Sequence, residues 1–211
     1  MLDRAGITGD DGASHNGMWD LAIMRVVPGL RLAAPRDGQQ LVNAIEKSVC
    51  IADGPSVIRF PKGTVSSDVP AIRSADFGDV LVDCDAPDVT FVSIGGLVHE
   101  VLEAASQLTA QGLRVRVIDP VWALPITDML VQEIRNSPIV VTVEDGVIDG
   151  GIGEAIGAKL HQCESTASVV NLGVPKAFLP HAKRAKLLKD LNLDARGIAA
   201  AAQERVRSIV H

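Results

Sequence analysis

The stretch VTFVSIGGLVHEVLEAASQLTAQGLRVRVI, residues 89–118, decides the fold class of this chain. It opens with a run of mostly β-branched and aromatic residues, which is typical of a buried strand. A helical pattern follows over residues 97–111 and stops at Gly112, because glycine commonly ends helices. An apolar strand pattern then covers residues 113–118. A strand, a helix and a second strand in this order predict two parallel strands joined by a crossover helix, the repeating unit of α/β proteins.

The same alternation continues to the end of the chain. Further strands are predicted over residues 79–84, 138–144 and 167–172. Further helices are predicted over residues 127–135, 152–163, 182–191 and 195–209. The part of the chain from residue 76 onward therefore supplies five predicted strands and the helices to cover them. We expect it to form a complete α/β domain with a mainly parallel five-stranded sheet.

The first part of the chain has fewer elements. Strands are predicted over residues 30–34 and 56–60, and helices over residues 19–27 and 37–50, the second of which starts at Asp37 as N-cap. Two strands are too few for an independent sheet. Residues 64 to about 76 follow neither period and are predicted to be a linker. We therefore expect an incomplete domain with its linker over residues 1–75 and a second domain over residues 76–211.

The composition indicates a globular protein and excludes several classes. The chain has 211 residues, 47% of them apolar and 22% charged, which fits a core that needs no disulfide or metal. Its net charge of -6 argues against nucleic-acid binding. The three cysteines are widely spaced, so no CxxC pair suggests zinc. No apolar run resembles a signal peptide or a membrane span, and we expect a cytoplasmic protein without membrane partners.

The chemistry that can be argued from residue types gathers in DRAGITGDDGASHNG, residues 3–17. This stretch contains a cation at Arg4, a carboxylate at Asp11 and an imidazole at His15, spaced by glycines that let a backbone bend closely around a ligand. A plain solvated turn is the alternative interpretation. A second glycine-rich stretch, residues 150–157, has GxGxxxG spacing rather than the GxGxxG of dinucleotide sites, so close helix packing explains it better. Glu144, at the end of a predicted buried strand, is a candidate contact to a partner subunit or a cofactor domain.

Several motifs together resemble a known enzyme family. They are the opening loop, the sequence RFPKG of residues 59–63, and the later sequences VIDP (117–120), VEDG (143–146) and NLG (171–173). Over essentially its whole length the chain resembles the 1-deoxy-D-xylulose-5-phosphate synthases, transketolase-like enzymes that use thiamine diphosphate. They join pyruvate to glyceraldehyde 3-phosphate with loss of CO2, a step toward isoprenoids. The resemblance implies a partial pyrimidine-binding domain followed by a complete transketolase C-terminal domain.

The resemblance also implies roles for individual residues. Basic side chains at the positions of Arg4 and Lys62 hold the phosphate of the acceptor aldehyde, a sugar phosphate, in this family. Arg59 is next to the phosphate-binding position and is the weaker candidate for direct contact. His15 matches the active-site histidine that contacts the substrates and assists proton transfer. Asp11 matches an aspartate near the donor site.

The resemblance further implies what other parts of the family's enzymes provide. Thiamine diphosphate and magnesium are held in the family by a glutamate and by a GDG sequence, and this chain contains no GDG. We therefore expect no cofactor-binding and no metal-binding residues here, and a C-terminal fragment or truncated homologue that is inactive alone. One alternative is a subunit of a split enzyme completed by a separate N-terminal chain. Another is a non-enzymatic dimerisation or binding module. Expected partners are a second copy of the chain or the missing N-terminal half.

Overall fold

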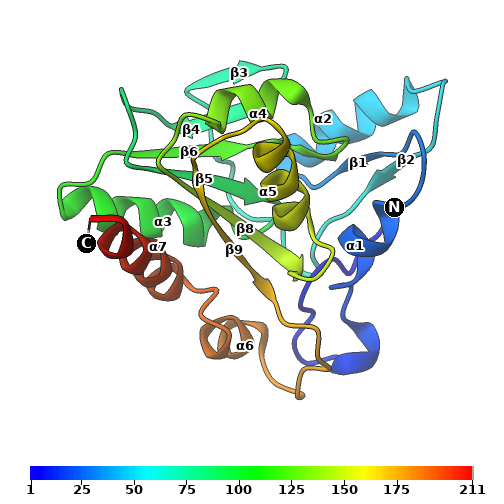
Figure 1. The fold of residues 1–211 in the computed structure, drawn as a ribbon. Coiled ribbons are helices and arrows are strands. Elements are labelled where there is room, and N and C mark those ends of the chain that lie inside the picture. The colour runs from blue at the N-terminus through cyan, green and yellow to red at the C-terminus, as the bar shows by residue number, and fades with distance from the viewer. Residues whose placement is uncertain (211) are drawn as a thin grey trace.

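A computed structural model describes residues 1–210, and its main feature is a six-stranded sheet (Figure 1). In spatial order the strands are β3 (Arg73–Ala75), β4 (Gly78–Val82), β6 (Val115–Asp119), β5 (Val89–Ile94), β8 (Ile139–Val147) and β9 (Ser168–Val174). Strands β6, β5, β8 and β9 are parallel, as the strand–helix–strand pattern predicts. The mainly parallel sheet of the second part is therefore confirmed.

Helices cover both faces of this sheet. They are α3 (Val98–Ala110), α4 (Asp128–Ile134), α5 (Ile152–Gln162), α6 (Arg184–Asp190) and α7 (Ala195–Val210). Every residue of β5 is buried, and alternate residues pack into different cores. Val89 and Phe91 belong to the core under α3 and α7, whereas Val92 and Ile94 belong to the core under α4 and α5. This two-sided burial explains why the strand is almost continuously apolar.

The sheet has one more strand than predicted. β4 pairs antiparallel with β6, and the short β3 pairs antiparallel with β4. All three residues of β3 are exposed, so its sequence lacks the alternation of apolar residues from which a strand can be predicted. It lies in the stretch that was predicted to be a linker, and only its pairing with β4 makes it a strand.

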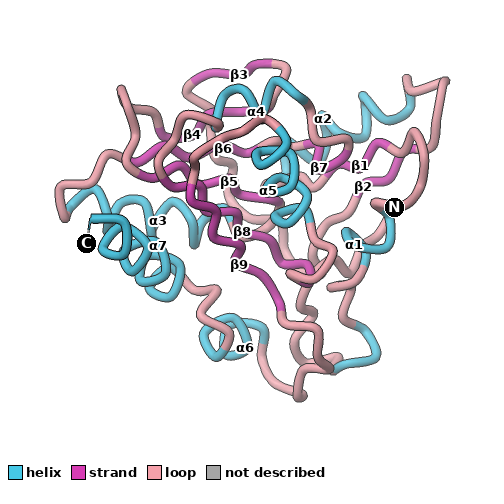
Figure 2. Tube along the Cα trace, in the orientation of Figure 1, coloured by secondary structure: helices cyan, strands magenta, loops and turns pink. Residues whose placement is uncertain are grey.

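A smaller sheet lies beside the large one (Figure 2). It consists of β1 (Arg31–Ala33), β2 (Ser56–Ile58) and β7 (Trp122–Leu124), with α1 (Asp20–Met24) and α2 (Gly38–Val49) from the same part of the chain as β1 and β2. β1 and β2 are parallel, and β7 is antiparallel to β1. β7 was not predicted. It comes from the second part of the chain and gives the first part the third strand that its own residues do not supply.

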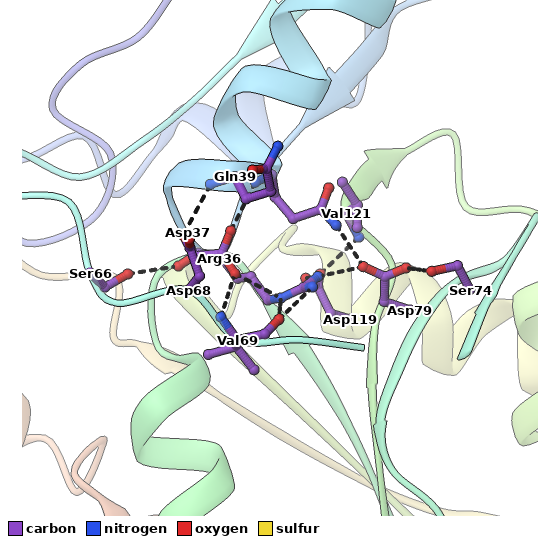
Figure 3. A network of polar contacts seen from close by, with 11 residues as sticks. Arg36, Asp37, Gln39, Ser66, Asp68, Val69, Ser74, Asp79, Asp119 and Val121 are labelled. Atoms are coloured by element: carbon purple, nitrogen blue, oxygen red, sulfur yellow. Dashed lines mark hydrogen bonds and ion pairs between the residues drawn. The ribbon is translucent and has the colours of Figure 1, made fainter. Parts of the chain in front are cut away.

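A buried ion-pair network joins the two parts of the chain (Figure 3). Nη1 of Arg36 donates hydrogen bonds to Oδ2 of Asp79 at 2.6 Å and to Oδ2 of Asp119 at 2.8 Å. Its Nε and Nη2 donate to the backbone oxygen of Val69, at 3.1 and 2.8 Å. Asp37 caps α2 as predicted, since its Oδ1 accepts from the backbone N of Gln40 at 2.8 Å. The predicted linker is thus held against the network rather than loose.

The charges in this network depend on one another. Burial opposes the charge on Arg36, but the hydrogen bonds and charges of Asp119 and Asp79 outweigh it and raise the pKa of Arg36. Burial raises the pKa of Asp119 to about 6, although its contact with Arg36 acts in the opposite direction. Arg36 is 4% exposed, Asp79 5% and Asp119 1%. An unpaired charge at this depth is costly, so each partner requires the others.

Glu144 connects the end of β8 to the start of α5. It is 1% exposed, and its two carboxylate oxygens accept hydrogen bonds from the backbone N of Ile152 at 3.1 Å and of Gly153 at 2.8 Å. Burial raises the pKa of Glu144 to about 7, against the effect of these two hydrogen bonds. A Cβ at Gly153 would overlap the Thr142 side chain, which confirms close helix packing at this position. Glu144 therefore caps a helix within the chain.

We predict that Arg36→Met destabilises the protein by about 3–5 kcal/mol, because it leaves Asp79 and Asp119 buried without their cation. Urea unfolding at neutral pH measures the change. Arg31→Met is the matched control on β1, since the ion pair between Arg31 and Asp53 is solvent-exposed. A loss of stability no larger than that of the control would contradict the central role of Arg36.

We predict a pH-dependent difference in stability between the wild type and Glu144→Gln. The pKa of Glu144 is about 7 in the folded chain, against an ordinary value of 4.5. Because the folded chain holds this proton more tightly than the unfolded chain, protonated Glu144 stabilises the fold. The stabilisation is complete below the ordinary pKa and is lost as pH rises through the folded value. From about pH 5 to about pH 8 the wild type should lose up to about 3 kcal/mol relative to the variant. Urea unfolding curves at several pH values measure this, and parallel pH profiles would contradict it.

Candidate functional site

The opening loop is closed at its base by hydrogen bonds between its two arms. Gly6 and Gly17 exchange two backbone N–H···O bonds of 3.3 and 2.9 Å. The side-chain oxygen of Asn16 accepts hydrogen bonds from N and Oγ1 of Thr8, at 3.0 and 2.9 Å. The returning arm contains the 3-10 helix Ala13–His15. These hydrogen bonds join the two arms of the loop at its base.

The segment that leads into this loop lies along the end of β2. The backbone N of Leu2 donates to the oxygen of Ile58 at 2.8 Å, and the N of Phe60 donates to the oxygen of Leu2 at 2.9 Å. The N of Ala5 then donates to the oxygen of Phe60 at 3.0 Å. This backbone pairing brings Arg4 beside the residues that follow β2.

Arg4 and Lys62 meet at the carboxylate of Asp11. Nζ of Lys62 lies 2.7 and 2.6 Å from the two oxygens of Asp11, and Nη1 of Arg4 lies 3.0 Å from Oδ2. The hydrogen bond from Lys62 lowers the pKa of Asp11, and the neighbouring positive charges act in the same direction. The side chains of Arg4 and Lys62 are 46% and 47% exposed. The structure thus brings three of the predicted site residues together at the surface.

His15 lies on the same loop and is exposed to solvent. Its Nδ1 is 2.9 Å from Oγ of Ser14, the preceding residue. A second histidine, His181, packs against the loop, since a Cβ at Gly12 would lie 3.2 Å from its Cδ2. The loop therefore presents His15 at the same surface as the cluster of Arg4, Asp11 and Lys62.

Arg59 is placed differently from the other predicted residues. It is 2% exposed, and its Nε and Nη1 donate to Asp20 at 2.8 Å and to Asp145 at 2.7 Å. Burial opposes its charge, but the charges of Asp145 and Asp20 outweigh this effect and raise the pKa of Arg59. Within residues 1–210, Nη2 of Arg59 and Oδ2 of Asp145 make no hydrogen bond. The structure does not bring Arg59 to the surface that Arg4 and Lys62 share.

The buried pair of Arg59 and Asp145 supports the opening loop from below. Gly6 has a φ of +68°, and a Cβ at this position would overlap the carboxylate of Asp145. Only glycine allows this close approach with such a backbone. Burial raises the pKa of Asp20, the first residue of α1, although Arg59 opposes the shift. Sequence reasoning missed both aspartates, although Asp145 follows a predicted buried strand, where parallel sheets place functional groups.

A cavity of about 430 Å³ opens beside Lys62. It is lined by residues 60–66, by residues 35–37 and by Asp3, Leu41, Gly96 and Arg184. A second cavity of about 490 Å³ lies between the two sheets and contains none of the predicted site residues. Because the first cavity shares Lys62 with the cation cluster, it is the better candidate for a ligand. Arg184 carries no sequence motif that could have placed it there.

The described part of the chain offers neither a metal-binding cluster nor a membrane-spanning helix. Within residues 1–210, no group of three or more His, Cys, Asp or Glu side chains is arranged to hold a metal ion. No described residue is therefore assigned to magnesium. Among the helices of the same residues, none combines the length and apolar character needed to cross a bilayer.

Comparison with protein families matches both parts of the chain. The family model described as the transketolase C-terminal domain matches residues 78–198. The model described as the transketolase pyrimidine binding domain matches residues 1–67.

Similar curated proteins carry one enzyme name. The 1-deoxy-D-xylulose-5-phosphate synthase 1 of Kitasatospora griseola is 41% identical over 211 residues, which are 100% of this chain and 32% of that protein. The 1-deoxy-D-xylulose-5-phosphate synthase of Rhodococcus jostii is 44% identical over 201 residues, 94% of this chain and 31% of that protein. The chain thus spans about a third of the length of these relatives.

Solved structures share the fold. A structure titled "Split gene transketolase, inactive beta4 tetramer" matches with a TM-score of 0.75 and 32% identity, covering 97% of this chain and 64% of that one. The transketolase of Leishmania mexicana matches with a TM-score of 0.75 and 22% identity, covering 95% of this chain and 28% of that one, and shows the fold alone. The two family models cover both parts of the chain, and the chain therefore belongs to the transketolase family.

Proposed function

We propose that this chain provides the acceptor-binding side of a 1-deoxy-D-xylulose-5-phosphate synthase. In that reaction pyruvate and glyceraldehyde 3-phosphate give 1-deoxyxylulose 5-phosphate and CO2. The observation that carries the proposal is that Arg4 and Lys62 both bind the carboxylate of Asp11, although Lys62 and Asp11 are 51 residues apart in the sequence. The names of the 41% and 44% identical relatives support the same reaction. We further propose residues 1–75 and 76–211 as the two domains, which the ranges matched by the family models support.

The cluster is suited to the phosphate group of the acceptor. Arg4 offers a planar fork with parallel N–H donors, and Lys62 offers a mobile point charge. Without a phosphate, the Asp11 carboxylate holds both cations in place. A phosphate dianion would compete with Asp11 for them, and Asp11 would then be free to accept hydrogen bonds from the hydroxyl groups of the substrate. Asp11 therefore keeps the cations together until the substrate arrives.

His15 and Arg59 have different roles in this proposal. His15 is accessible on the loop, and an imidazole can exchange a proton near neutral pH. We assign it to contact with the substrates and to proton transfer. Arg59 is buried on Asp20 and Asp145, so we assign it to positioning the loop rather than to binding phosphate.

The reactive centre of the proposed reaction is the thiamine cofactor. When bound, thiamine diphosphate supplies the carbanion chemistry that the amino acids lack. None of the described residues is assigned to its diphosphate or to magnesium, so the proposal requires residues outside these 211 to hold both. The chain would orient the acceptor and would have no activity by itself.

We predict that inorganic phosphate binds the chain and that Arg4→Met and Lys62→Met each weaken this binding about tenfold. The reason is the loss of one charge-assisted hydrogen bond in an exposed site. Isothermal titration calorimetry measures the affinity. Lys159→Met is the matched control, because Lys159 is also paired with a single aspartate, Asp128, outside the cluster. Unchanged affinity in both cluster variants would contradict the proposal.

We also predict that the chain alone forms no 1-deoxyxylulose 5-phosphate from pyruvate and glyceraldehyde 3-phosphate when thiamine diphosphate and magnesium are added. Calorimetry with thiamine diphosphate and magnesium should show no binding. Product formation, or cofactor binding in the micromolar range, would show that these residues suffice for the cofactor.

A split enzyme is the second candidate function, and one observation favours it. The structure titled as a split gene transketolase covers 97% of this chain at 32% identity. If the chain is such a subunit, a separate polypeptide supplies the cofactor-binding residues. Mixing the chain with the preceding two thirds of a related synthase should then give product and a stable complex on size-exclusion chromatography. Separate elution with no activity would count against this candidate.

A further inference from the structure

Arg184 forms part of the wall of the cavity beside Lys62. It begins α6, far from Lys62 in the sequence, and the opening loop packs directly against it. A Cβ at Gly9 would lie 2.7 Å from the backbone N of Arg184. The loop, the strand end that carries Lys62 and the start of α6 thus meet around one cavity.

The guanidinium of Arg184 is incompletely satisfied. Its Nε and Nη2 are buried and make no hydrogen bond with any residue of the described part of the chain. A guanidinium stays charged at all physiological pH values, so these donors cannot be neutralised by losing a proton. A buried donor without a partner costs free energy, and native structures rarely retain one without a reason.

Arg184 is partly buried, whereas two arginines of the first part, Arg36 and Arg59, are fully buried and are bound differently. Arg36 pairs with Asp37, Asp79 and Asp119, and Arg59 pairs with Asp20 and Asp145. Arg184 forms no ion pair among residues 1–210. Its charge is thus left without the carboxylates that the fold provides for the other two.

The rest of the cavity wall defines the ligand further. Lys62 and Thr64 also line the cavity, as does Arg36, whose charge is already matched by Asp37, Asp79 and Asp119. Asp3 also lines the cavity, and a carboxylate accepts hydrogen bonds from hydroxyl groups but repels a second anion. The lining therefore combines cations that suit a phosphate with a carboxylate that suits hydroxyl groups.

We infer that Arg184 is a third cation of the anion site, which binds with Lys62 the phosphate of a small hydroxyl-bearing ligand held in this cavity. The inference rests on the proposed function, because Lys62 belongs to both. A guanidinium gives a phosphate two parallel hydrogen bonds, and two of its donors here have no other described partner. The C-terminal domain thereby contributes a binding residue to a site whose other cations lie on the opening loop and in the segment after β2.

The test is calorimetric titration of the 211-residue chain with inorganic phosphate. Arg184→Met should weaken phosphate binding about tenfold, and Arg184→Lys should restore part of the loss. Lys186→Met is the matched control, because it removes one positive charge from the same helix, where Lys186 pairs with Asp190 at the surface. It should change the affinity less than about twofold.

A second readout separates a binding role from a structural one. Because the buried donors of Arg184 have no described partner, Arg184→Met should unfold in urea at the same concentration as the wild type without phosphate, or at a higher one. With saturating phosphate the wild type should gain more stability than the variant. An Arg184→Met variant that is less stable without phosphate and gains as much from phosphate as the wild type would overturn the inference.

The possible results separate this inference from the proposed function. If Arg4→Met and Lys62→Met weaken phosphate binding and Arg184→Met does not, the inference is wrong and the proposed function stands. If Arg184→Met alone weakens binding, Lys62 has no part in the site, and both the shared site and the proposed function are contradicted. Glycerol 3-phosphate should bind more tightly than inorganic phosphate, and equal affinity would overturn the assignment of a hydroxyl-bearing ligand.

Discussion

The buried guanidinium of Arg36 is the interaction on which the arrangement of this chain depends. Arg36 follows β1 in the first part of the chain. Its guanidinium binds Asp79 in β4 and Asp119 at the end of β6, and it donates hydrogen bonds to the backbone oxygen of Val69. Burying one cation with several carboxylates is favourable only when all of them are in place. The network therefore ties the first part of the chain to two strands of the large sheet, and the pairing of β7 with β1 adds a further connection between the two parts.

A second buried arginine, Arg59, joins the two parts of the chain beneath the candidate site. Arg59 follows β2 and binds Asp145, which lies near the end of β8. The glycine turn of the opening loop lies directly over Asp145, so the loop is supported by both parts of the chain. Arg36 is bound to two aspartates of the second part and Arg59 to one, and these contacts support the surface on which Arg4, Asp11 and Lys62 meet. The candidate site therefore depends on contacts between the two parts of the chain, and neither part forms it alone.

Much of the fold could be predicted because burial leaves a local pattern. The alternation of apolar strands and amphipathic helices placed β5, α3 and β6 within a few residues of their observed bounds. The prediction missed β3 and β7 for a physical reason. All three residues of β3 are exposed, so its pairing with the neighbouring β4 leaves no apolar pattern. β7 becomes a strand through its pairing with β1, and a partner that distant in sequence leaves no local sign.

The sequence by itself determined the family, the α/β class and the set of polar residues in the opening loop, because these depend on residue types and short spacings. Only the tertiary structure decided which of those residues lie together. It brought Lys62 to Arg4 through the pairing of residue 2 with the end of β2, and it turned Arg59 inward to Asp145. It also placed Arg184 in the wall of the same cavity as Lys62, which lies 122 residues earlier in the sequence. Contacts between charges so far apart arise from the packing of the two sheets, which no local pattern of residues encodes.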